Sequence, residues 1–298
     1  MISGSFNGEP LRRELPEVMA LFEHLIDKNI EEVVGAGGDL LIPFAFEETL
    51  CRDIGTGLAP PSLHLWSHPG GVALGLRDSK LPFAALAMAK LERSGLRTAV
   101  RHSGGAAVPL DAGVVNVSLI LPKSRGKLDF HDDFRLLSSL ITEAVAVSHP
   151  QAAAQIVAGE VQGSYCPGEF DLAIGGRKFC GIAQRRQSNA YFVHAFVVVA
   201  GSGQARGELI HSFYEDAAGG EQALSYPRVS PETIAGLQEL GGPDTVGMFA
   251  TGIRQALARR GVELMSSAAL RQDTGYALEY TDLRVVEAAG MLRERYSL

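Results

Sequence analysis

The sequence predicts an α+β protein in which helices flank a mixed or antiparallel sheet. Helical stripes and strand-like runs are interleaved without the strict strand–helix alternation of a parallel α/β fold. The 298 residues are 46% hydrophobic and 20% charged, which is typical of a globular chain that builds its own core. No apolar run approaches the ~20 residues of a membrane-spanning helix, so a membrane protein is not expected.

The charge and the cysteine content indicate which partners and which compartment the protein is expected to have. A net charge of −7 argues against nucleic-acid binding through bulk electrostatics. The N-terminus lacks the basic and apolar regions of a secretory signal, and the three cysteines, an odd number, are expected to be free thiols in a reducing compartment. We therefore expect a cytoplasmic protein in which Cys51, Cys166 and Cys180 are each candidate reactive thiols.

The first half of the chain predicts two helices followed by a strand. Apolar residues recur with helical spacing over residues 14–26, which predicts the first helix. Residues 81–94 predict the second, with Pro82 in its first turn and Gly95 just past its end. Residues 115–121 are rich in β-branched side chains and predict a strand.

The middle of the chain predicts a helix, a hairpin and a buried strand. Asp132 is placed to cap a helix whose apolar stripe runs from Leu136 to Val145. Residues 170–174 and 177–184 are joined by Gly175-Gly176, a two-residue hairpin signal. Residues 191–200 form an apolar run that predicts a strand buried on both faces.

Residues 227–298 are predicted to form a small helical extension that follows a catalytic domain of residues 1–226. Ser230 with Pro231 predicts the start of one helix, since this pair matches a capping residue followed by proline at the first helical position. Asp244 predicts the start of another, which ends at Gly261.

A glycine-rich segment at residues 101–118 is the first candidate binding site. Ser103-Gly104-Gly105 leaves two backbone positions without side chains, so a ligand can lie directly on the chain or meet its N–H groups. An ordinary turn between two strands explains the same residues. Neither a Walker A loop nor a dinucleotide-binding fingerprint is present.

The hairpin supplies a candidate lysine. Pairing across Gly175-Gly176 places Ala173 opposite Lys178, Leu172 opposite Phe179 and Asp171 opposite Cys180. Lys178 is then expected on the face away from the core, available to a ligand, although a solvated edge lysine fits the same spacing.

Cys166 is the candidate nucleophile. It lies in a Tyr-Cys-Pro-Gly turn, where the thiol is expected near the surface and where a nearby cation such as Lys178 would favour the thiolate. Cys180 shares the predicted strand face with Lys178 and is the alternative. Cys51 is expected to be a structural residue of a helix.

Metal and serine-nucleophile chemistry lack support in the sequence. His64 and His68 have the i, i+4 spacing of helical metal ligands, but the adjacent Pro-Gly-Gly argues against a helix there. There is no Cys-x-x-Cys pair and no Gly-x-Ser-x-Gly motif. No metal and no cofactor are therefore expected.

From about residue 40 to residue 201 the sequence resembles the biotin/lipoate protein ligase superfamily. The similarity rests on L-H-L-W-S-H-P-G-G-V-A-L-G, on R-H-S-G-G-A-A-V-P-L-D-A-G-V-V-N-V-S and on the lysine strand G-G-R-K-F-C-G-I-A-Q-R-R. The block G-S-Y-C-P-G-E-F-D-L further resembles the octanoyltransferases that act on octanoylated glycine cleavage H protein. Val100, Ala106 and Leu110 replace an arginine, a glycine and a histidine of the superfamily pattern.

This resemblance implies an amidotransferase of protein lipoylation. Its partners would be octanoylated or lipoylated glycine cleavage H protein and the lipoyl domains of 2-oxo acid dehydrogenase acyltransferase subunits, with no nucleic acid or membrane. It implies Cys166 and Lys178 as catalytic residues. The implied substrate-binding residues are Arg101, Ser103, Gly104, Gly105, Leu74, Val108, Asn116 and Gly181, and strand residues near Val115 and Val117 are expected beside them. An ATP-dependent lipoate–protein ligase and a non-catalytic acyl-binding or lipoyl-domain-binding protein are the alternatives.

Overall fold

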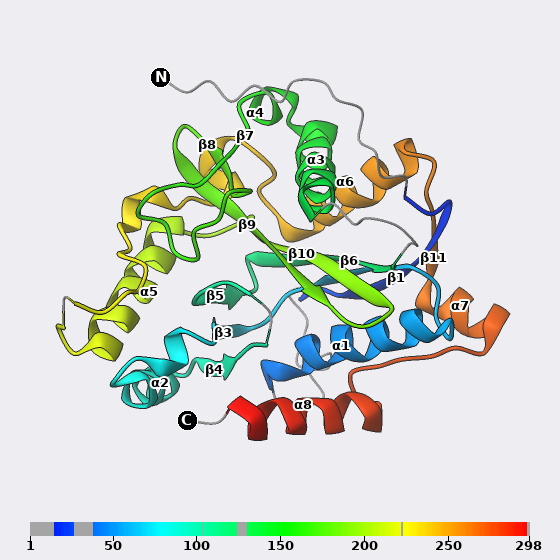
Figure 1. The fold of residues 1–298 in the computed structure, drawn as a ribbon. Helices are drawn as coiled ribbons and strands as arrows, with labels where there is room; N and C mark the ends of the chain where they lie inside the picture. The colour runs from blue at the N-terminus through cyan, green and yellow to red at the C-terminus, as the bar shows by residue number, and fades with distance from the viewer. Residues whose placement is uncertain (1–14, 27–37, 103, 124–129, 222, 297–298) are drawn as a thin grey trace.

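A mixed sheet of eight strands forms the centre of the computed structural model, and a sheet of three strands lies beside it (Figure 1). The structure describes residues 15–26, 38–102, 104–123, 130–221 and 223–296. The large sheet has the order β11-β1-β2-β6-β10-β9-β8-β7 and the small one β4-β3-β5. The strands are β1 (Val18–His24), β2 (Ser62–Trp66), β3 (Gly70–Leu74), β4 (Arg97–Val100), β5 (Val108–Asp111), β6 (Val114–Pro122), β7 (Val157–Ala158), β8 (Leu172–Ile174), β9 (Arg177–Arg186), β10 (Ala190–Val198) and β11 (Glu263–Ser266).

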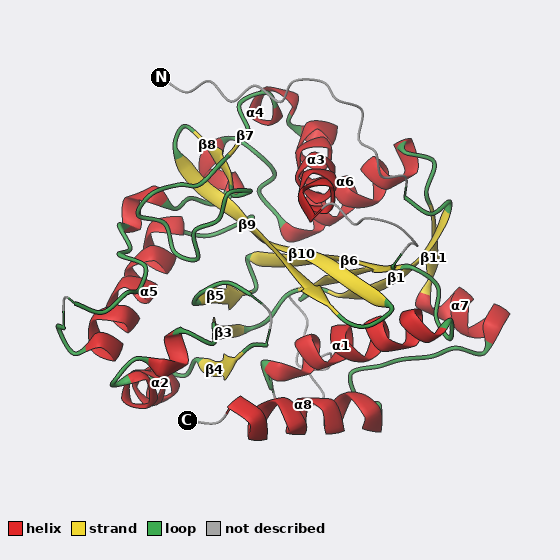
Figure 2. Ribbon diagram, in the orientation of Figure 1, coloured by secondary structure: helices red, strands yellow, loops and turns green. Residues whose placement is uncertain are grey.

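Helices cover both faces of the large sheet (Figure 2). Helices α3 and α6 pack together on one face, and α1 with α8 lies on the other. Helices α2 and α5 pack against each other beside the small sheet. The helices are α1 (Leu41–Thr56), α2 (Ala84–Arg93), α3 (Phe130–Ser148), α4 (Pro150–Ala153), α5 (Gly203–Ala218), α6 (Val246–Arg259), α7 (Ser267–Thr274) and α8 (Leu283–Tyr296), with short 3₁₀ turns at η1 (Asp78–Lys80), η2 (Pro231–Thr233) and η3 (Leu237–Leu240).

The mixed sheet confirms the predicted α+β class. Strand β1 runs parallel to β2 and β11, and β3 runs parallel to β4, whereas the other pairs are antiparallel. Alternate side chains of the central strands enter two separate cores. Val115 and Val117 of β6 pack with residues of α3 and α6, while Ile120 packs with residues of α1.

Most of the predicted elements are present. The helices at 81–94 and after Asp132 correspond to α2 and α3, although α3 begins at Phe130, before Asp132. The strands at 115–121 and 191–200 correspond to β6 and β10, and every residue of β10 is buried. Gly175 and Gly176 both have positive φ angles, 58° and 76°, as the tight hairpin turn requires.

The helix predicted over residues 14–26 is wrong. Residues 18–24 form strand β1, which lies between β2 and β11. Met19 enters the core beneath α3 and α6, whereas Ala20 and Phe22 enter the core beneath α1. A strand buried on both faces has no polar side to mark a period of two, so its apolar residues also matched a helical pattern.

The hairpin differs from its predicted register by one β-bulge. Ala173 pairs with Lys178 as expected, but Leu172 pairs with Cys180 and the register shifts between Leu172 and Ala173. Phe179 and Cys180 consequently both enter the core of α3 and α6. Cys180 is therefore fully buried, not on the open face where its pairing with Asp171 was predicted to place it.

The C-terminal residues are mainly helical and are built into the fold. At the predicted helix starts the structure has a 3₁₀ turn over Pro231–Thr233 and α6, which Thr245, not Asp244, caps. Strand β11 extends the large sheet at β1, and α8 packs on α1. The division of the chain at residues 226 and 227 stays a prediction.

Substituting Gly252 with alanine is expected to lower the free energy of unfolding by about 1–2 kcal/mol. A Cβ atom on Gly252 would lie 2.4 Å from the Ala144 carbonyl oxygen, where α6 crosses α3, and overpacking of this kind costs ~1–3 kcal/mol. Gly247→Ala is the control in the same helix, because its Cβ would meet no atom within 4 Å. Urea denaturation of both variants measures the difference, and equal stabilities would contradict tight packing of α6 on α3.

Candidate active site

A cavity of about 260 Å³ lies where β9 and β10 meet α1, β5 and two loops. The loops are the glycine-rich segment after β4 and the segment that precedes β8. The lining residues are Phe44, Arg101, Gly104, Gly105, Val108, Leu110, Asn116, Phe134, Cys166, Pro167, Gly168, Gly181, Ile182, Ala183, Gln184, His194 and Phe196. Apolar side chains dominate this list, so the cavity suits a ligand with a hydrocarbon portion.

Cys166 lies on the wall of this cavity in a strained backbone conformation. Its φ angle is 46°, and no other non-glycine residue in the described part of the chain has a positive φ angle. Holding a residue with a Cβ in the left-handed region costs ~1–3 kcal/mol and requires support from its surroundings. The side chain is partly exposed, as the turn prediction expected.

Two donors converge on the sulfur of Cys166. The backbone N–H of Ala106 donates to Sγ at 3.2 Å, and Arg101 Nη2 lies 3.5 Å from the same atom. Arg101 Nη2 also donates to the Ala106 carbonyl at 2.7 Å, which fixes the guanidinium against the loop. A backbone N–H and a guanidinium therefore both contact the same sulfur.

Gly105 allows this close approach. Its φ angle is 99°, and a Cβ atom there would lie 2.7 Å from Cys166 Sγ and 2.6 Å from Arg101 Nη2. Gly75 allows a second close approach, since a Cβ atom there would lie 2.0 Å from the Gly105 carbonyl oxygen. The glycine-rich segment is therefore packed closely against the thiol.

Lys178 is buried, not solvated at an edge. Its side chain is 1% exposed, and Nζ donates to the carbonyl oxygens of Cys166 at 2.7 Å and Tyr165 at 3.0 Å. Asp171 Oδ2 lies 2.8 Å from the same nitrogen. Nζ is thus joined to the backbone of Cys166, whereas the cation that contacts Sγ is the guanidinium of Arg101.

The structure brings together six of the eight predicted substrate-binding residues. Arg101, Gly104, Gly105, Val108, Asn116 and Gly181 all line the cavity. Leu74 is fully buried in the core, where its carbonyl accepts from the Arg101 N–H, and it does not appear among the lining residues. Ser103 lies outside the described residues.

The prediction that strand residues near Val115 and Val117 line the cavity holds for Asn116 and not for the two valines. Both side chains enter the core beneath α3 and α6, while Asn116 between them lines the cavity. Strand alternation explains the difference, because neighbouring residues face opposite sides of the sheet. Gly181 is required to be small, since a Cβ there would lie 2.6 Å from the Phe196 ring and 3.2 Å from Lys178 Nζ.

His194, Phe44 and Phe196 also line the cavity and were not predicted. Burial lowers the pKa of His194 to about 4, so its imidazole is neutral at neutral pH. A polar residue within the apolar run of residues 191–200 is the signal that marks this position. The aromatic residues carry no comparable signal, since buried phenylalanines are abundant in any core.

A buried polar cluster lies among the helix α1 and the central strands. Glu47 Oε1 accepts from Trp66 Nε1 at 2.9 Å and from Ser118 Oγ at 2.6 Å, and it pairs with His64 Nδ1 at 3.0 Å. Burial opposes ionisation of Glu47, but the contact with His64 lowers its pKa below the ordinary value. His64 is therefore a partner of a carboxylate, and within the described residues no metal-binding group of His, Cys, Asp and Glu is found.

A charged cluster fixes the start of the glycine-rich segment. Glu48 of α1 accepts from His102 at 2.8 Å and from Arg185 of β9 at 3.2 Å. Burial alone would raise the pKa of Glu48, but these two contacts lower it to about 2. Helix α1, the loop and β9 are thereby tied together at one side of the cavity.

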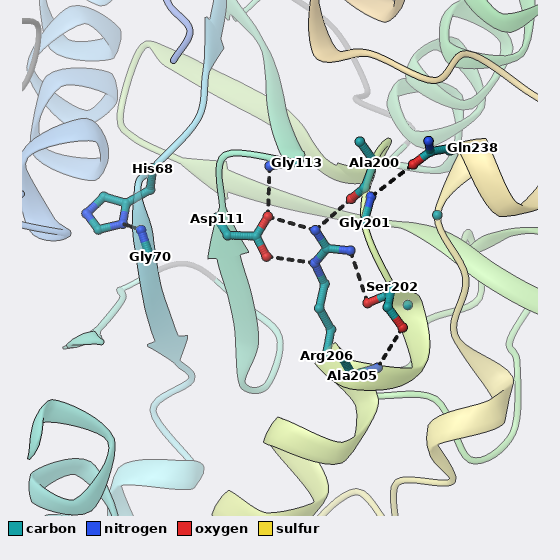
Figure 3. A network of polar contacts seen from close by, with 12 residues as sticks. His68, Gly70, Asp111, Gly113, Ala200, Gly201, Ser202, Ala205, Arg206 and Gln238 are labelled. Atoms are coloured by element: carbon teal, nitrogen blue, oxygen red, sulfur yellow. Dashed lines mark hydrogen bonds and ion pairs between the residues drawn. The ribbon is translucent and has the colours of Figure 1, made fainter. Parts of the chain in front are cut away.

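Strand β5, which also lines the cavity, is anchored by Arg206 (Figure 3). Arg206 donates to both oxygens of Asp111 at 2.7 Å and to the carbonyl of Ala200 at 2.7 Å. Its Nη1 donates to the carbonyl of Ser202, which caps α5. This bidentate pair fixes the end of β5, whose Val108 and Leu110 line the cavity.

Replacing Arg101 with glutamine is expected to slow alkylation of Cys166 by iodoacetamide at neutral pH roughly three- to tenfold. The variant removes the cation beside Sγ, and a hydrogen bond to a charged group contributes ~1.5–3 kcal/mol. The greater nucleophilicity of a more basic thiolate offsets about half of this amount. Mass spectrometry of the alkylated peptide measures the rate. Arg177→Gln, an exposed residue at the hairpin turn, is the control. An unchanged rate in Arg101→Gln would show that this guanidinium does not activate the thiol.

The chain shares its fold with lipoate–protein ligases. A crystal structure of lipoate-protein ligase A bound with ATP aligns with 94% of this chain and 97% of its own, with a TM-score of 0.63 at 17% identity. The chain belongs to the lipoyl protein ligase A/B catalytic domain family, which it matches over residues 39–258.

Relatives within this family include acyltransferases. An octanoyl-[GcvH]:protein N-octanoyltransferase of Anoxybacillus flavithermus is 40% identical over 237 residues, which cover 79% of this chain and 84% of the relative. A lipoyl-[GcvH]:protein N-lipoyltransferase of Listeria monocytogenes is 36% identical over 68% of this chain and 72% of its own. No helix in the part of the chain that the structure describes is long and apolar enough to cross a membrane.

Proposed function

We propose that this protein is an N-octanoyltransferase that moves octanoyl or lipoyl groups between lysine side chains through a thioester on Cys166. The donor is the modified lysine of glycine cleavage H protein, and the acceptor is a lipoyl-domain lysine of a 2-oxo acid dehydrogenase acyltransferase subunit. The observation that carries the proposal is the Cys166 sulfur on the wall of an apolar cavity, with the Ala106 N–H and Arg101 directed at it. The names of the relatives support the same activity.

The cavity suits the acyl chain. Phe44, Val108, Leu110 and Phe196 supply apolar surface beside the thiol. Burial of one methylene group contributes about 0.8 kcal/mol, so the tail of an octanoyl group contributes on the order of 5 kcal/mol to binding. Binding of the tail then holds the amide carbonyl near Sγ, which lowers the entropic cost of the attack.

The transfer consists of two balanced steps. The Cys166 thiolate attacks the amide carbonyl of the acylated donor lysine, a C–S bond forms, the C–N bond breaks, and the leaving amine takes up a proton. The acceptor lysine then attacks the thioester as a free amine, loses a proton as the new amide forms, and releases the thiolate. One amide is exchanged for another, so the overall reaction requires no ATP.

The polar groups at the site have separate roles in these steps. Arg101 and the Ala106 N–H stabilise the sulfur as thiolate before attack and after release. His194 is a neutral imidazole on the cavity wall and can exchange a proton with a lysine amine. Lys178 donates to the carbonyl of Cys166, whereas the cation at the sulfur is Arg101.

The lining of the cavity favours the thioester route over an acyl-adenylate. Among the described residues that line the cavity, Arg101 is the only lysine or arginine. Leu110 adds apolar surface. Val100 is buried at the end of β4 and also lacks charge. Stabilising the phosphate of an adenylate requires several cations, whereas a thioester requires one activated sulfur.

Intact-protein mass spectrometry tests the proposal. We expect the wild-type protein, mixed with octanoylated glycine cleavage H protein, to acquire one octanoyl group that peptide mapping assigns to Cys166, without ATP. Hydroxylamine should remove this group, because thioesters are cleaved by it and amides are not. An adduct that forms only with free octanoate or lipoate and ATP would indicate a ligase, and binding without any adduct would indicate a non-catalytic protein.

A further inference from the structure

Lys178 uses its whole donor capacity on the Cys166 loop. A lysine ammonium has three N–H donors. Three oxygens lie within 3.0 Å of Nζ, namely the carbonyls of Tyr165 and Cys166 and Asp171 Oδ2. Lys178 and Asp171 are each 1% exposed, so water does not compete for these contacts. The arrangement resembles a structural clamp more than a free proton carrier.

Asp171 closes the clamp from the other side. The same Oδ2 atom that pairs with Lys178 accepts from the backbone N–H of Gly168 at 3.1 Å. The Asp171 N–H in turn donates to the Gly168 carbonyl at 3.1 Å. One carboxylate therefore joins the ammonium on β9 to the backbone two residues beyond Cys166.

Lys178 and Asp171, which together form the clamp, hold the backbone on both sides of Pro167. Cys166, at φ 46°, is held at its carbonyl by Lys178, and Gly168 is held by Asp171. Strain of this kind persists only where neighbouring contacts over-determine the backbone. Sγ lies 3.2 Å from the Ala106 N–H only while the loop keeps this conformation.

We propose that Asp171 is a positioning residue for the acyl transfer, which acts through Lys178 to hold Cys166 Sγ against the Ala106 N–H and Arg101. The inference rests on the proposed function. Neutralising Asp171 leaves the Lys178 ammonium buried without its anion, so its two carbonyl contacts and the loop conformation are lost together. The apolar side chains proposed to hold the acyl chain, namely those of Phe44, Val108 and Phe196, lie outside this loop, so the rate is expected to change more than the binding.

The rate of acyl transfer should also depend on pH through Asp171. Burial raises the pKa of Asp171 to about 6, although Lys178 opposes this shift. The other ionisable groups that face Asp171 are Glu160, Tyr165 and Cys180, and burial raises the pKa of the last two above their ordinary values. Acidification through about pH 6 then protonates Asp171 and slows the transfer. The raised pKa means that the folded state binds this proton more tightly than the unfolded chain, so the loss of rate is not unfolding driven by Asp171.

Single-turnover kinetics of thioester formation test the inference with Asp171→Asn, Asp171→Glu and the control Glu169→Gln. Glu169 is an exposed acid in the same loop. We expect Asp171→Asn to lose at least about tenfold in rate at a saturating donor concentration, with little change in the donor concentration that gives half the maximal rate. The pH–rate profile of this variant should lack the fall in rate near pH 6, its acid limb. Asp171→Glu retains the charge and should recover part of the rate and the acid limb. Glu169→Gln should match the wild type.

Rates are expressed per folded protein, from circular dichroism melts of each variant. A normal rate in Asp171→Asn with the acid limb intact would overturn the proposal. If Asp171→Asn fails to fold, a fall in rate at low pH whose midpoint differs between Asp171→Glu and the wild type, but not between Glu169→Gln and the wild type, supports it, and one midpoint for all three proteins overturns it. Alkylation of Cys166 by iodoacetamide separates the two hypotheses. Suppose that no protein forms a thioester but Cys166 is alkylated more slowly in Asp171→Asn than in the wild type. The proposed octanoyl transfer is then wrong, whereas the positioning role of Asp171 stands.

Discussion

Cys166→Ser is expected to reduce octanoyl transfer by at least ~10³-fold while the fold remains intact. A serine hydroxyl stays protonated at neutral pH and cannot form the thioester of the proposed mechanism, even though both donors to position 166 remain in place. The side chain is partly exposed and nearly the same size as serine, so little packing is lost. Transfer from octanoylated glycine cleavage H protein to a lipoyl domain, followed by gel shift or mass spectrometry, measures the effect.

The control for this variant is another thiol of the same chain. Cys51 is fully buried in α1, and burial raises its pKa to about 12. Cys51→Ala should therefore lower the stability slightly and keep the transfer rate per folded protein. A nucleophile at position 166 would be contradicted if Cys166→Ser transferred octanoyl groups at the wild-type rate. It would also be contradicted if Cys51→Ala lost as much of the transfer rate as Cys166→Ser.

Gly105→Ala is expected to lower the rate of transfer by about 100-fold, because an added methyl group displaces the thiol. The new Cβ would lie 2.7 Å from Cys166 Sγ and 2.6 Å from Arg101 Nη2, and a φ angle of 99° is strained for alanine. Both the sulfur and the cation beside it have to move. Single-turnover acylation and the rate of Cys166 alkylation should both fall.

The neighbouring glycine provides the comparison. A Cβ on Gly104 would meet no atom within 4 Å, and its φ angle is not positive, so Gly104→Ala should lose much less rate than Gly105→Ala. Gly247→Ala, in the first turn of α6 and far along the chain from the site, should behave like the wild type. Equal losses at positions 104 and 105 would show that the loop binds substrate without positioning the sulfur.

Local patterns predicted the parts of the fold that local physics determines. The stripe from Leu136 to Val145 identified α3 because one face of that helix is buried and the other is not. Gly175 and Gly176 identified the hairpin because few other residues adopt two successive positive φ angles. Gly104 and Gly105 of the candidate site were found because two successive glycines leave the backbone open to a ligand.

Long-range contacts determine what the patterns missed. Strand β1 is buried on both faces only because β2, β11 and two helix layers surround it, and nothing in residues 14–26 shows those neighbours. The bulge opposite Leu172 turned Cys180 into the core, and no turn residue marks it. The partner of Sγ is Arg101, 65 positions away from Cys166, a contact that only the assembled fold reveals.

The pairing of β1 with β11 has a consequence for synthesis of the chain. Val18 lies beside Glu263, so the outer neighbour of β1 leaves the ribosome more than 200 residues after β1 itself. Throughout that interval β1 presents a free parallel edge, a known template for association with other chains. We therefore expect nascent chains that stop before residue 263 to depend on chaperones more than the finished protein does.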